Sequence, residues 1–113
     1  MQGGKALELA WVHLFLAGLL EIAWALGMKL SHGFTRLGWT LFTAAAMVLS
    51  FAFLLLAIRQ LPLGTAYAVW TGIGAAGTAL VGIFFLGEPS DLARLLCIAA
   101  IVAGVAGLKL TSG

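Results

Sequence analysis

Glu21 is a lone carboxylate within a long apolar stretch near the start of the sequence. Its neighbours three and four positions away, which share its face on a helix, are Ala17, Gly18, Trp24 and Ala25. None of them is basic, so no local charge neutralises the carboxylate. Loss of hydration favours the neutral, protonated carboxyl group, whereas a bound cation favours the charged form. Glu21 can therefore hold a proton or a cation in turn, which is the chemistry that proton-coupled antiport requires.

Four further side chains lie inside apolar runs and could complete a cation site. Trp24 follows Glu21 by three residues, and Trp70 follows Tyr67 by the same spacing, so each pair shares a helix face. Trp and Tyr donate hydrogen bonds to carboxylates, and their ring faces attract cations. Ser50 adds a hydroxyl inside the second apolar run. Each aromatic residue alone could equally pack in the bundle or lie at the membrane interface. Because these residues lie well inside the apolar runs, beside a buried acid, we favour a site that binds substrate and protons.

No motif in the sequence indicates enzyme chemistry. It contains no set of nucleophile, base and orienting residue, no phosphate-binding loop and no cofactor signature. His13 and His32 have no partners at metal-ligand spacing, and Cys97 is the only cysteine, which excludes an intrachain disulfide. We therefore expect no catalytic residues, no cofactor and no metal.

Composition indicates where the candidate residues must lie. The chain has 113 residues, of which 63% are hydrophobic and 9% charged, whereas a soluble domain carries about 25% charged residues. Four apolar runs cover residues 9–28, 37–58, 63–87 and 92–108. A helix crosses the hydrocarbon core of a bilayer in roughly 20 residues. The sequence therefore predicts an all-α integral membrane protein, a single domain over residues 1–113 built as a four-transmembrane-helix bundle.

A membrane location sharpens the interpretation of Glu21. A carboxylate inside a bilayer is unfavourable unless it is protonated, paired with a cation or facing a water-filled cavity. Glu21 could instead be a neutral residue that hydrogen-bonds within the bundle and only supports the structure. We favour a functional role, because ionisable groups inside a membrane usually have one. We also expect the first run to be a retained span rather than a cleaved signal peptide, because it is long and contains this acid.

The basic residues bear on orientation and on partners. With such short connections, successive helices run antiparallel and both termini lie on one side of the membrane. That side would hold Lys5, Arg59 and Lys109, and the other side Lys29, Arg36 and Arg94. Lys and Arg in the loops set the orientation of a membrane protein, so an even balance allows two interpretations. Either some of these residues have little effect on orientation, or the chain inserts in both orientations and pairs with an inverted copy. We favour the second, and the absence of a basic cluster predicts no nucleic-acid partner.

Small residues in the last two spans suggest movement and association. Gly72 and Gly74 could weaken the third span enough to bend it, and we predict a conformational hinge there. The alternative is close helix packing, because small residues also let membrane helices approach one another. Gly104 and Gly107 in the fourth span suit a helix–helix contact and are predicted to form the dimer seam.

Four segments resemble the small multidrug resistance family. They are EIAWALGMK at 21–29, GFTR at 33–36, PLGTAYAVWTGIG at 62–74 and GVAGLK at 104–109. The resemblance extends over nearly the whole chain. It implies an antiparallel, dual-topology homodimer in the bacterial inner membrane that exports cations in exchange for protons, with the two Glu21 side chains in one shared site.

Within that family, Trp24 and the run from Gly64 to Gly72 resemble the guanidinium-exporter subtype. The resemblance implies that Glu21, Trp24, Ser50, Tyr67 and Trp70 form the binding network for guanidinium, with protons, lipid and a second copy of the chain as the other partners. Cys97 departs from the glycine that is common in multidrug members. The nearest alternative is a broader exporter of quaternary ammonium compounds, which Trp24 should hinder by crowding their path. A passive channel and a structural membrane subunit are more distant alternatives.

Overall fold

The computed structural model describes residues 2–111, with side chains from residue 4 onward. It contains α1 (Gln2–Leu30), α2 (Leu37–Ile58), α3 (Leu63–Phe85) and α4 (Leu92–Thr111). All four helices are long and apolar enough to cross a membrane. The predicted all-α architecture of four apolar helices is therefore confirmed.

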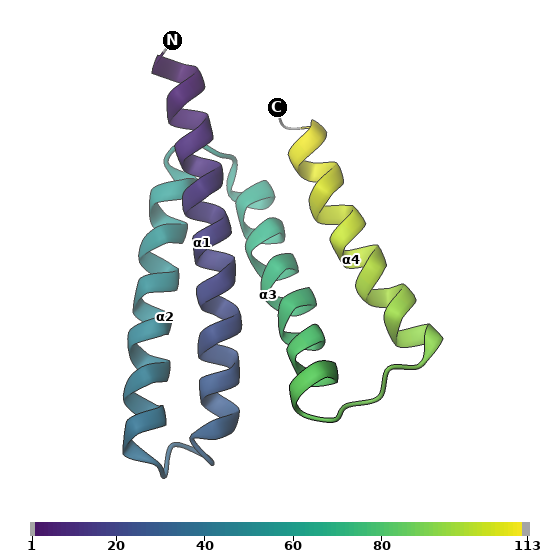
Figure 1. Ribbon diagram of the computed structural model, residues 1–113. Helices are drawn as coiled ribbons and strands as arrows, with labels where there is room; N and C mark the ends of the chain where they lie inside the picture. The colour runs from purple at the N-terminus through teal and green to yellow at the C-terminus, as the bar shows by residue number, and fades with distance from the viewer. Residues whose placement is uncertain (1, 112–113) are drawn as a thin grey trace.

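The helices form a simple up-and-down arrangement (Figure 1). The start of α1 and the end of α4 lie at one end together with the α2–α3 connection, and the α1–α2 and α3–α4 connections lie at the other end. Buried Ser31 organises the α1–α2 turn, because its hydroxyl donates to the carbonyl of Met28 at 2.8 Å and accepts from the amide of Phe34 at 3.0 Å. This turn returns the chain directly alongside α1.

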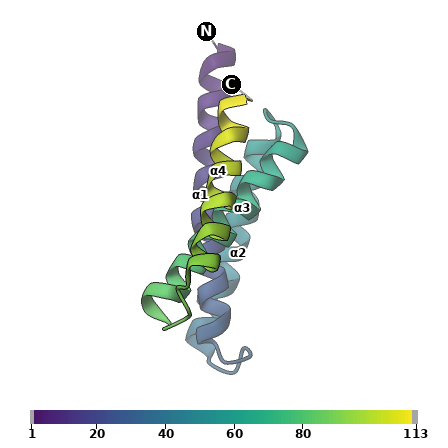
Figure 2. The same ribbon diagram turned by 90° about the vertical axis from the view of Figure 1, so that its right-hand side faces the viewer.

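Helix α1 packs against both α2 and α3, and α3 also contacts α2 and α4. Small residues allow these close approaches. A Cβ at Gly18 would lie 2.6 Å from Cγ2 of Ile73 on α3, and a Cβ at Gly27 would lie 3.0 Å from Cδ2 of Phe42 on α2. Figure 2 shows α3 running obliquely across α1. The crossing brings the middle of α3 against the part of α1 that carries Glu21.

Helix α4 is the most exposed part of the bundle. Its backbone lies close to that of α3 alone among the described helices, and Ile98 is its one buried residue. Near its end, the Lys109 ammonium lies 5.0 Å from the centre of the Trp11 ring of α1. Gly104 and Gly107 have nothing within 4 Å of the Cβ positions that a side chain would occupy. The predicted seam is thus an open surface of the single chain, and its role remains a prediction.

The glycines of α3 lie in helix contacts. The helix is continuous across Gly72 and Gly74. A Cβ at Gly72 would lie 2.5 Å from Cγ2 of Val105 on α4, whereas Gly74 and Gly77 face α1. Close packing is therefore a function of these glycines in this conformation. A hinge would require a second conformation of α3, so it too remains a prediction.

Candidate functional site

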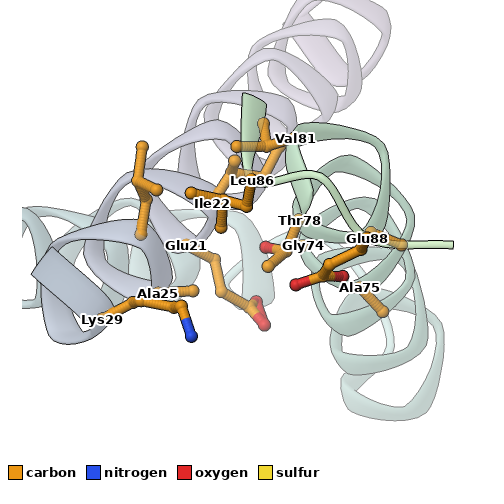
Figure 3. Close-up of a pocket in the computed structure, with 12 residues that line it drawn as sticks. Glu21, Ile22, Ala25, Lys29, Gly74, Ala75, Thr78, Val81, Leu86 and Glu88 are labelled. Carbon is orange, nitrogen blue, oxygen red and sulfur yellow. The ribbon is translucent and has the colours of Figure 1, made fainter. Parts of the chain in front are cut away.

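A pocket of about 430 Å³ lies between α1 and α3. Glu21 and Lys29 line it from α1, and Gly74 and Thr78 line it from α3. The connection that follows α3 contributes Glu88 to the same lining. Figure 3 shows the carboxylates of Glu21 and Glu88 and the amine of Lys29 directed into this space from different sides. The pocket thus combines apolar walls with a few charged groups, which is typical of sites for small polar ligands.

The Glu21 carboxylate lies directly against the backbone of α3. A Cβ at Gly74 would overlap the Glu21 carboxyl carbon and lie 2.5 Å from Oε1, so only glycine leaves room for the acid. Oε2 of Glu21 is buried and has no hydrogen-bond partner among the described residues. A buried acceptor without a partner is costly. A proton or a bound cation would satisfy this atom.

A chain of hydrogen bonds fixes α2 and α3 relative to α1. The Ser50 hydroxyl of α2 donates to the carbonyl of Ala17 at 2.7 Å and accepts from Nε1 of Trp70 at 3.0 Å. In an α-helix the carbonyl of Ala17 also accepts the amide of Glu21, four residues later. Ser50 and Trp70 therefore fix the helical turn that carries the acid.

Tyr67 extends this group toward the surface. Its ring meets that of Trp70 edge-on, with centroids 5.6 Å apart and an interplanar angle of 61°. Tyr67 is 55% exposed, whereas Trp70 is 8% exposed and Ser50 is fully buried. The three side chains predicted on α2 and α3 are thus contiguous.

Trp24 and Glu21 do not join that group directly. No hydrogen bond within residues 4–111 links Glu21 to any of the other four predicted residues. Nε1 of Trp24 is buried and, like Oε2 of Glu21, has no partner in the described chain. One copy of the chain therefore joins Ser50, Tyr67 and Trp70. It leaves Glu21 and Trp24 outside that group, with an unused acceptor and an unused donor on α1.

Lys29 and Glu88 line this pocket although neither was predicted as a site residue. Lys29 lies two helical turns beyond Glu21 on α1, and this spacing was an available signal. Glu88 follows the third apolar run and belongs to no motif in the sequence. Its location depends on how the chain turns after α3, which no local pattern indicates.

Replacing Ser50 with Ala should loosen the packing around this pocket. Trp70 would lose its acceptor, and we expect the free energy of unfolding to fall by about 1 kcal/mol, the size of an interhelical hydrogen bond in a membrane. Unfolding in mixed detergent micelles measures the change. Thr40→Ala is the matched control, because the Thr40 hydroxyl of α2 donates only locally, to the carbonyl of the N-cap residue Arg36 at 2.7 Å. An equal loss in both variants would show that the Ser50 contact adds nothing.

Comparison with known proteins agrees with the resemblance in the sequence. Residues 9–101 match the family model described as Small Multidrug Resistance protein. A guanidinium exporter of Citrobacter freundii is 57% identical over 104 residues, which are 92% of this chain and 99% of that relative. Guanidinium exporters of Yersinia pestis and Proteus vulgaris are 56% and 55% identical over 104 residues, 92% of this chain and 100% of each relative. The predicted resemblance is therefore confirmed over most of the chain.

Proposed function

The chain belongs to the small multidrug resistance family, and from this premise we propose that it exports guanidinium ions in exchange for protons. As a member of this transporter family it is a multi-pass protein of the bacterial inner membrane and not an enzyme. The observation that carries the proposal is the Glu21 carboxylate, which lies in a pocket against Gly74 with one buried oxygen unpaired. The relatives named guanidinium exporters support the choice of substrate.

Glu21 would act as the exchange point. Guanidinium is planar and can form two parallel hydrogen bonds with a carboxylate. The same oxygens cannot hold a proton and pair with a cation equally well, so binding of one ligand displaces the other. In this proposal Trp24, three residues after the acid on α1, would contribute its indole N–H, and the Tyr67 and Trp70 rings would orient the cation. Guanidinium binding should therefore weaken as the pH falls.

The complete site in this proposal contains two copies of the chain in antiparallel orientation. The even distribution of Lys and Arg allows both orientations in the membrane. In a single copy, α4 is almost wholly exposed, and Glu21 and Trp24 stay apart from the joined Ser50, Tyr67 and Trp70. An inverted partner that packs at Gly104 and Gly107 would bring a second Glu21 to the pocket. Many transporters use two inverted halves around a site at the middle of the membrane.

Alternating access in this proposal arises at α3. A bend at Gly72 and Gly74 would separate the two halves of a helix that is continuous through this region in the described conformation. Gly74 lies against the Glu21 carboxylate, so the occupant of the acid would influence which conformation of α3 is stable. A bound proton or guanidinium ion would thereby allow the site to open to the other side of the membrane.

Exchange in liposomes tests the proposal. Purified protein in vesicles with an imposed pH gradient should drive guanidinium against its own gradient, and reversing the pH gradient should reverse the flux. Flux that ignores the pH gradient would indicate a passive channel and overturn antiport. Bulky quaternary ammonium ions, tested in parallel, should exchange poorly. Equal exchange of those ions would overturn the substrate assignment in favour of the broader exporter.

A further inference from the structure

We infer that Glu88 is a second cation-binding point at the mouth of the Glu21 pocket, where a guanidinium ion takes the place of the Arg94 side chain. The inference rests on the proposed function and deepens it, because it gives the substrate a position before or after Glu21. Four features of the chain support it: the turn that positions Glu88, the place of Glu88 along the pocket, the Arg94 side chain paired with Glu88 and the balance of charge around the pocket.

The end of α3 holds Glu88 against the helix. The carbonyl of Gly82 accepts the amides of both Leu86 and Glu88, at 3.1 Å and 3.0 Å. Gly87 between them has a φ of +71°, a conformation that glycine adopts freely. A Cβ at Gly82 would lie 2.6 Å from the Glu88 carboxyl carbon and 2.9 Å from its Oε2. The turn therefore fixes the carboxylate over a glycine, as Gly74 accommodates Glu21.

Glu88 and Glu21 occupy separate positions along one pocket. Both side chains line it, and Figure 3 shows both carboxylates directed into it. The glycines that accommodate them, Gly74 and Gly82, are eight residues apart on α3, which corresponds to about 12 Å along the helix axis. Charge-assisted hydrogen bonds span only about 2.7–2.9 Å, so the two acids do not form one compact site. A cation would visit them in succession.

The present partner of Glu88 has the same chemistry as the proposed substrate. Nη2 of Arg94 lies 3.6 Å from Oε1 of Glu88, and the two side chains are 44% and 39% exposed. This distance is longer than that of a well-formed guanidinium–carboxylate pair, and ion pairs this exposed contribute little to stability. A free guanidinium ion offers the same planar set of donors. It can therefore replace Arg94 at Glu88 with little loss to the fold.

The charges around the pocket favour a guanidinium ion that replaces Arg94 at Glu88 over one that binds in addition to it. Lys29 and Arg94 balance the charged forms of Glu21 and Glu88. A further cation is accommodated most easily when one resident cation withdraws, and Arg94 is the cation whose withdrawal leaves the Glu88 carboxylate free. Glu88 would then concentrate guanidinium at the mouth of the pocket and raise its capture rate at low concentration. It would have little effect on the maximal rate, which depends on Glu21 and on the conformational change.

Two substitutions that break the same ion pair should act in opposite directions. Glu88→Gln removes the proposed binding point, whereas Arg94→Gln frees it. We expect the half-saturating guanidinium concentration for exchange to rise about threefold in the first variant and to fall about threefold in the second, changes typical of a partly exposed ion pair. The double variant should behave as Glu88→Gln alone. Maximal rates at saturating guanidinium, measured in the same vesicles, should stay close to that of the unmodified protein.

Asp91→Asn is the matched control, because Asp91 is an exposed acid of the same connection that does not line the pocket. Its half-saturating concentration should not change. If Glu88 and Arg94 only stabilise the connection, their two variants will shift in the same direction or not at all, and either result overturns the inference. A maximal rate lost in both variants would likewise indicate a structural role. Failure of the unmodified protein to exchange guanidinium at any concentration would instead overturn the proposed function.

Discussion

Glu21→Gln is expected to abolish proton-coupled guanidinium exchange while the protein still folds. Glutamine keeps the size of the side chain in the space beside Gly74, but it can neither lose a proton nor carry a negative charge. Hydrogen bonds to a charged group are worth about 1.5–3 kcal/mol each, so losing a two-pronged pair should weaken guanidinium binding roughly a hundredfold or more. Exchange in vesicles under a pH gradient and equilibrium binding in detergent measure the two effects.

Glu8→Gln is the control for this substitution. Glu8 is the other acid of α1, and it is exposed and distant from the Glu21 pocket. Exchange should be unchanged in that variant. Retained proton-coupled uptake in Glu21→Gln would remove the acid from the mechanism, whatever the behaviour of the control.

Gly74→Ala should have the second largest effect. The added Cβ would occupy the space of the Glu21 carboxyl group, so the acid must withdraw from its position against α3. Overpacking of this kind typically costs about 1–3 kcal/mol, and we expect guanidinium affinity to fall about tenfold to a hundredfold. Equilibrium binding is the decisive measurement, because a substitution that only stiffens a hinge would slow turnover and leave affinity unchanged.

Two further variants make the Gly74 prediction specific. Gly64→Ala lies on the same helix, where an added Cβ has nothing within 4 Å, and it should bind normally. Adding Glu21→Asp to Gly74→Ala shortens the acid by one methylene and should restore part of the lost affinity. Normal binding by Gly74→Ala alone would contradict the close contact between Gly74 and Glu21.

The helices could be predicted from the sequence where charge delimits an apolar run. The second run, 37–58, coincides with α2 because Arg36 and Arg59 flank it. Helix α1 begins well before its apolar run, since Lys5 and Glu8 can be helical without lying in the hydrocarbon. Helix α3 ends at Phe85, two residues short of the predicted run, where the chain begins the turn at Gly87. Hydropathy thus locates the helices but not their ends.

The candidate residues could be predicted within a helix but not between helices. Glu21 is evident because a lone charge in an apolar run needs a reason. The link from Trp70 through Ser50 to Ala17 joins three helices and depends on how each helix is rotated and crossed. Glu88 approaches the pocket only because Gly82 and Gly87 turn it there. Spacing along one helix carries none of this information.

Proton release on guanidinium binding is the measurement that isolates the exchange at Glu21. Guanidinium added to the purified protein in weakly buffered detergent, at a pH where the acid is largely protonated, should release protons in proportion to the sites filled. Glu21→Gln should release none. Saturable binding of guanidinium to the unmodified protein without any release of protons would show that the two ligands do not compete for Glu21.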